Sequence, residues 1–62
     1  MNKLKFWRLE RGLSQVELAD VSGVPRHVVQ LSEQGIRRPS ADQQLALAEA
    51  LGVALKDLFP NS

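Results

Sequence analysis

The sequence predicts a single all-α domain of five short helices. No segment alternates apolar and polar residues as a half-buried strand does. The four glycines stand where helical patterns end, and polar start signals stand where they begin. With 62 residues the chain is near the lower limit for folding alone, because a domain of that size buries only about 60% of its unfolded surface. We therefore expect one compact domain over residues 1–62.

The helix boundaries follow from local signals. We expect helices over 3–11, 15–22, 25–34, 41–51 and 54–59. Each glycine suits the position just past a helix end, namely Gly12, Gly23, Gly35 and Gly52. Ser14 and Glu17 have the spacing of a capping box, and Ser40 and Gln43 repeat it. Pro25 suits the first turn of the third helix, where its missing N–H costs nothing.

Apolar residues at helical spacing predict the core. They are Leu4, Trp7, Leu18, Val21, Leu45, Ala48, Leu51, Leu55, Leu58 and Phe59. The last helix has Ala54 where a polar cap is usual, so we expect it to fray in a monomer.

Composition excludes several function classes. The chain has no Cys, which excludes disulfides and thiolate metal sites and suits a reducing compartment. Its apolar runs are too short to cross a membrane, and no signal peptide is visible. We expect a cytoplasmic protein, and the ordinary Met1 start favours a complete small protein over an excised domain.

The net charge of +1 is a weak argument for a nucleic-acid partner. Its distribution is more informative. Residues 23–40 carry three arginines against one glutamate, whereas residues 41–62 carry one lysine against three acidic residues. This polarity permits a basic face without requiring one.

Residues 15–34 carry the motif that indicates a function. A helix over 15–22, a tight turn at 22–24 and a second helix over 25–34 form a helix-turn-helix, whose second helix usually reads the DNA major groove. Further elements surround it: G-L-S-Q at 12–15, E-L-A at 17–19, G-V at 23–24, E-Q-G at 33–35, R-R-P at 37–39 and A-L-G-V at 50–53.

With these elements the chain resembles the Cro/phage-repressor (Xre-like) family over nearly its whole length. The resemblance implies a compact, lambda-repressor-like domain. It also implies a partly buried ion pair between Arg8 of the first helix and Glu33, which would lock the reading helix in place. Breaking that pair should destabilise the fold, because the remaining charge would lack a partner.

Phosphate contacts are expected on both sides of the reading helix. Gln15 lies in the first turn of its helix, where the free amides and the dipole favour a phosphate, although it can also be simply solvated. In the family the loop around Gly35 straddles the DNA backbone. The resemblance therefore implies phosphate contacts from Gln34, Arg37, Arg38 and Ser40. Such contacts set the register on DNA without specifying sequence.

The rotation of the reading helix is open between two alternatives. At about 100° per residue the apolar pattern groups Val24, Val28 and Leu31 and so buries Leu31. The family register is rotated modestly from this and buries Pro25, Val28, Val29 and the residue at 32. It points Leu31 outward, although Ser32 replaces the large apolar residue usual at that position. Arg26 and Gln30 face outward in both.

Base contacts follow from side-chain chemistry. Arg26 can bind guanine through O6 and N7, Gln30 can pair with adenine, and an outward Leu31 can touch a thymine methyl group. His27 can donate to a base or a phosphate. As a single histidine without cysteines or clustered carboxylates, it makes neither a metal site nor a catalytic pair. We expect no cofactor, no metal and no enzyme activity.

We expect the protein to be a sequence-specific regulator of transcription that binds double-stranded DNA and acts as a repressor by occupying a promoter. One helix reads few base pairs, so we expect a homodimer on a near-palindromic operator. The family dimerises around its last two helices, which implies a patch of Val53, Leu55, Leu58 and Phe59, although some of these residues must also serve the core.

Two alternatives stay open. The chain can be a protein-binding module, such as an antitoxin or anti-repressor with a toxin or regulatory partner. It can also activate transcription, because the resemblance places Asp20 where an acidic residue can touch RNA polymerase.

Overall fold

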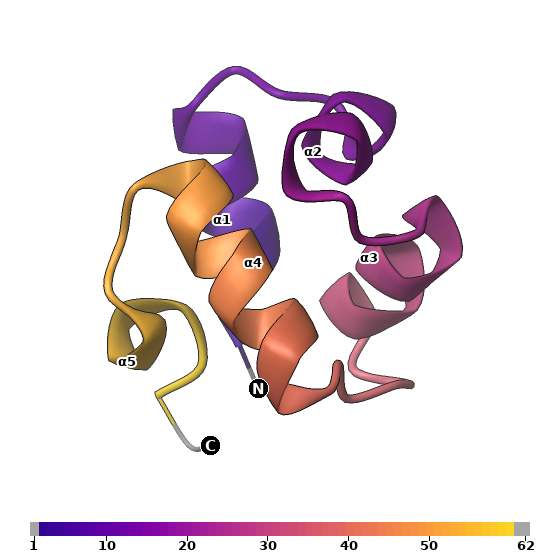
Figure 1. Ribbon diagram of the computed structural model, residues 1–62, viewed down its shortest axis with the longest axis vertical. Coiled ribbons are helices and arrows are strands. Elements are labelled where there is room, and N and C mark those ends of the chain that lie inside the picture. Colours follow the sequence, from indigo (N-terminus) through magenta and orange to yellow (C-terminus); the bar gives the residue numbers. More distant parts are fainter. Residues whose placement is uncertain (1, 61–62) are drawn as a thin grey trace.

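The structure is a computed structural model that describes residues 2–60 (Figure 1). Met1, on which the expectation of a complete small protein rests, lies outside the described residues. The described chain forms α1 (Leu4–Glu10), α2 (Gln15–Ser22), α3 (Arg26–Glu33), α4 (Ala41–Leu51) and α5 (Leu55–Leu58). No strand occurs within residues 2–60, and the all-α prediction is confirmed. The predicted bounds hold for α2 and α4, whereas α1, α3 and α5 are each one residue shorter at both ends.

The helices pack against one another in neighbouring pairs. α2 contacts both α3 and α4, α1 contacts α3, and α5 contacts α4. Figure 1 shows α2 and α3 on one side of α4 and α5 on the other. No helix in the described part of the chain is long and apolar enough to span a membrane.

Both predicted capping boxes are present. The Ser14 hydroxyl accepts from the Glu17 N–H at 3.0 Å, and the Ser14 N–H donates to the Glu17 carboxylate at 2.8 Å. This hydrogen bond to the charged form lowers the pKa of the Glu17 carboxyl group. Ser40 and Gln43 make the same reciprocal pair at the start of α4. Two of the predicted helix starts are therefore fixed by side chains a few residues apart.

The turn between α2 and α3 depends on Gly23 and Pro25. Gly23 has φ +75°, a left-handed conformation that is strained for any residue with a Cβ atom. Its N–H donates to the Ala19 carbonyl and so ends α2. Pro25 lies at the N-cap of α3 and not in its first turn as predicted. Its carbonyl accepts from the N–H groups of Val28 and Val29. Pro25 therefore caps α3, whose first helical residue is Arg26.

The core is apolar and continuous. Its buried members are Leu4, Leu18, Val24, Val28, Val29, Leu47, Ala48, Leu51, Leu58 and Phe59, and Trp7 packs against them partly buried. Three predicted core residues are exposed instead: Val21 (61%), Leu45 (50%) and Leu55 (39%). On α2 and α4 the buried stripe is centred on other residues, which leaves Val21 and Leu45 roughly 110° from its middle. α5 is one turn long and buries Leu58, so Leu55 faces outward.

The segment before α1 is hydrogen-bonded to two distant parts of the chain. The Asn2 side chain accepts from the Leu4 N–H and donates to the Ser32 carbonyl at 2.9 Å. The Lys3 N–H donates to the Leu58 carbonyl at 2.9 Å. These bonds attach the beginning of α1 to the ends of α3 and α5.

Candidate nucleic-acid interface

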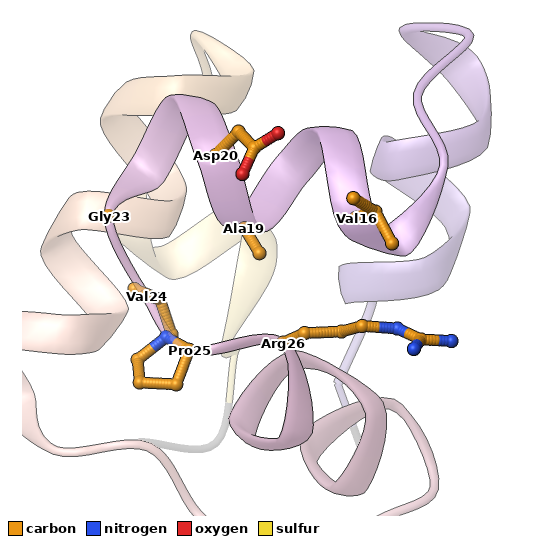
Figure 2. A pocket seen from close by; sticks show the side chains of 7 residues that line it. All are labelled: Val16, Ala19, Asp20, Gly23, Val24, Pro25 and Arg26. Atoms are coloured by element: carbon orange, nitrogen blue, oxygen red, sulfur yellow. The ribbon is translucent and has the colours of Figure 1, made fainter.

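The helix-turn-helix predicted over about 15–34 is present as α2, the turn at residues 23–25 and α3. Val24 in the turn is 4% exposed and anchors it in the core. The Val24 N–H donates to the Ser22 hydroxyl at 3.1 Å, which fixes the path between the helices. In Figure 2 the axis of α2 crosses above the beginning of α3.

The rotation of α3 is set by its buried face, which consists of Val28, Val29 and Ser32. The burial of Leu31 predicted from the apolar pattern is wrong, because Leu31 is only partly buried. The family register is confirmed at these buried positions but wrong at Pro25, whose position in the turn leaves it exposed.

The outward face of α3 carries Arg26, His27 and Gln30, all exposed. Leu31 lies at the edge of this face, beside the fully buried Ser32. The residues predicted to read bases are therefore together on one surface.

A bidentate ion pair holds that rotation. Arg8 on α1 donates from Nε to Glu33 Oε2 at 2.6 Å and from Nη2 to Glu33 Oε1 at 3.1 Å. The two side chains are 9% and 4% exposed. The hydrogen bond to Glu33 raises the pKa of the Arg8 guanidinium, which burial alone would lower. With Glu33 directed toward α1, Leu31, two residues earlier and about 200° around the helix, faces away from α1.

Gln15 joins the same carboxylate. Its Nε2 donates to Glu33 Oε1 at 3.1 Å, and the Arg8 Nη1 donates to the Leu13 carbonyl at 2.8 Å. This network connects α1, α2 and α3. The resemblance implied its Arg8–Glu33 pair, but nothing in the sequence indicated that Gln15, 18 positions before Glu33, shares the carboxylate. The second amide N–H of Gln15 can still donate to a phosphate.

The loop from Gln34 to Ser40 is attached at both ends. The N–H groups of Ile36 and Arg37 donate to the Leu31 carbonyl, and the buried Gln44 side chain donates to the Pro39 carbonyl at 3.0 Å. The remaining predicted phosphate-binding residues in this loop, Gln34, Arg37, Arg38 and Ser40, are exposed. The Ser40 hydroxyl accepts the capping bond of α4, and its own O–H can still donate.

The predicted dimer patch is only partly available. Leu58 is fully buried and Phe59 is 6% exposed, so both serve the core of this chain. They are buried because α5, a single turn, must close the core with its apolar side. Val53 is partly buried, and Leu55 is 39% exposed.

A groove that the sequence did not predict lies between α2 and the start of α3 (Figure 2). Its volume is about 420 Å³, and its wall consists of Val16, Ala19, Asp20, Gly23, Val24, Pro25 and Arg26. The groove adjoins the outward face of α3 through Arg26. Within residues 2–60 no group of three or more His, Asp or Glu side chains has the arrangement of a metal site.

Comparison with known proteins identifies the family. A model of a family described as helix-turn-helix matches residues 4–58. The chain belongs to this family. An uncharacterized HTH-type transcriptional regulator of Methanocaldococcus jannaschii is 36% identical over 58 residues, which are 94% of this chain and 88% of that protein.

A solved structure has the same helix-turn-helix fold. The restriction-modification controller protein C.AhdI of Aeromonas hydrophila superposes with a TM-score of 0.86 and 40% sequence identity, over 92% of this chain and 86% of that one. At this level the prediction of a helix-turn-helix transcriptional regulator that binds double-stranded DNA is confirmed.

Proposed function

We propose that the chain is a repressor that reads a near-palindromic operator with α3. The observation that carries the proposal is the fixed rotation of α3. Buried Val28 and Val29 and the bond from Arg8 to Glu33 hold α3 so that it presents one polar face to solvent. On that face we assign Arg26 to a guanine and Gln30 to an adenine. His27 and Leu31 extend the same surface toward neighbouring bases.

Phosphate contacts on both sides of α3 supply the sequence-independent part of the affinity. On one side Gln15 stands at the beginning of α2, where the helix dipole favours an anion. On the other side lie Gln34, Arg37, Arg38 and Ser40 of the following loop. Each arginine that binds a phosphate releases counterions, so affinity should fall steeply with salt.

A homodimer supports specificity. One α3 covers only a few base pairs, whereas two copies related by a twofold axis read two half-sites. Leu55, exposed on α5, and the partly buried Val53 beside it are the part of the predicted patch open to a second copy. A repressor of this kind acts by occupying a promoter in the cytoplasm, bound to the nucleoid.

Selection of bound sites from random double-stranded DNA tests the proposal. We expect a near-palindromic site containing a guanine in each half. The variant Arg26→Ala should weaken specific binding by about 1–3 kcal/mol and relax that position of the site. If Arg26→Ala bound selected and random DNA as the unaltered chain does, Arg26 would not read a base.

A second candidate, a protein-binding module such as an antitoxin or anti-repressor, is favoured by one observation. Phe6 and Leu9 stand three residues apart on α1 and are 56% and 58% exposed. Large apolar side chains that share an exposed helix face are typical of a protein contact. Phe6→Ser with Leu9→Ser should then abolish capture of the product of a neighbouring gene while leaving operator binding intact.

A further inference from the structure

The groove between α2 and α3 brings apolar side chains next to Arg26. Val16 and Ala19 point from α2 toward the start of α3, and the Arg26 side chain extends beneath Val16 (Figure 2). Val16 is 47% exposed, so much of its surface is available to a ligand. An apolar wall therefore stands beside the guanidinium that the proposed function assigns to a guanine.

The occupant of this groove is limited by charge. Asp20 also lines it, and a carboxylate repels a phosphate group. Val16 and Ala19 offer no hydrogen-bond donors that a phosphate would need. With Arg26 engaged by a guanine, as the proposed function has it, the rest of the groove suits the edge of a base and not a phosphate.

The base on the 5′ side of the guanine lies next to the arginine in the major groove. An arginine bound to O6 and N7 of guanine lies near the plane of that base in the major groove. The pyrimidine on its 5′ side presents its C5 position beside the guanidinium. Thymine carries a methyl group there and cytosine a hydrogen atom, so an apolar side chain above the arginine distinguishes them.

We propose that Val16 is a specificity-determining residue that contacts the methyl group of a thymine directly 5′ of the guanine bound by Arg26. The inference rests on the proposed function, because it needs Arg26 at a guanine. It adds a residue of α2 to a reading surface otherwise formed by α3. The operator half-site should then contain the step 5′-TG-3′.

The test uses a site selected from random DNA by the full chain. The first step locates the position of the site at which Arg26→Ala no longer prefers guanine. The thymine on the 5′ side of that guanine is then replaced by deoxyuridine, which lacks only the methyl group. We expect the unaltered chain to bind the deoxyuridine site about three- to fourfold more weakly, the factor that corresponds to about 0.8 kcal/mol for one buried methyl group. Val16→Ala should bind both sites equally.

Val21→Ala is the matched control, because Val21 is a second exposed valine of α2 and lies outside the groove. It should keep the full preference for thymine. In a further arm, cytosine in place of thymine should weaken binding by the unaltered chain, and 5-methylcytosine should restore it.

The outcomes separate the two proposals. Equal binding of thymine and deoxyuridine by the unaltered chain, or an undiminished preference in Val16→Ala, would overturn the role of Val16 while leaving Arg26 as a base reader. A selected guanine without a 5′ thymine would overturn it as well. If no site is selected, the proposed function fails and the role of Val16 fails with it.

Discussion

The helices α3 and α5 are held in place by different means. α3 buries Val28 and Val29 and is also fixed by the directional bonds of Glu33 to Arg8 and Gln15. α5 has no side-chain cap at Ala54 and is held by the burial of Leu58 and one backbone bond from Lys3.

Apolar burial is non-directional, whereas a bidentate ion pair fixes an angle. In the proposed function α3 presents a defined face, and polar bonds specify its rotation in addition to burial. α5 only closes the core, and within the described part of the chain no side-chain cap or ion pair specifies its rotation.

Glu33→Ala should give the largest effect. It removes the partner of Arg8, whose side chain is 9% exposed, and leaves a buried charge unpaired. We expect the free energy of unfolding to fall by about 3–5 kcal/mol in urea denaturation. Glu49→Ala, at an exposed position of α4, is the control and should change little. A loss below about 1 kcal/mol for Glu33→Ala would mean that burial alone fixes α3.

Leu58→Ala tests whether burial of this side chain holds α5 in place. Leu58 is fully buried, so we expect a loss of about 2–5 kcal/mol in the free energy of unfolding, measured by thermal or urea denaturation. Leu55→Ala alters the same helix at a side chain that is 39% exposed. It should cost less than about 1 kcal/mol. Equal losses from the two variants would contradict the orientation of α5.

Ala54→Ser should give α5 the side-chain hydrogen bond that it lacks at its beginning. The backbone of Ala54 is already extended, as an N-cap residue requires, and lacks only a side-chain acceptor. A serine there should raise the free energy of unfolding by about 0.5–1 kcal/mol. Ala54→Val adds no acceptor and should give no gain, so a similar gain in both variants would exclude capping as the cause.

The smallest expected effect is the pH dependence contributed by Glu17. Its pKa is lowered in the folded state from an ordinary value of 4.5, so its stabilising contribution is complete above that pH and is lost as the pH falls through the folded value. Glu17→Gln keeps a hydrogen-bond acceptor that does not titrate in this range. Below pH 4.5 the stability of the unaltered chain should fall more steeply than that of Glu17→Gln. Parallel curves in urea denaturation would show that Glu17 contributes no pH dependence.

Helix ends could be predicted from the sequence because their signals are local. Ser14 and Glu17, three residues apart, fix the start of α2, and Gly23 fixes its end. Side-chain orientation was predicted less well. The apolar pattern alone buries Leu31, but the structure buries Ser32, because the buried valines of α3 and the bond between Arg8 and Glu33 set the rotation together.

Contacts between distant parts of the chain were the least predictable. The resemblance to a known family implied the pair of Arg8 and Glu33, but no spacing indicated that Gln15 shares the carboxylate. The groove at Val16 was missed for the same reason, because it exists only where α2 crosses the start of α3. Leu58 and Phe59 were predicted both as core and as part of the dimer patch, and the structure buries them in the core. The sequence could not separate the two roles, because a pattern shows that a residue is apolar but not which surface covers it.

The shared carboxylate of Glu33 has a consequence for how the molecule opens. Arg8 on α1 and Gln15 on α2 both donate to a residue at the end of α3, so no one of these helices can leave without breaking bonds to another. Local openings of a protein tend to follow cooperative units of this kind. The three helices should therefore exchange their amide hydrogens as one unit, and α5 should open before them at lower free energy.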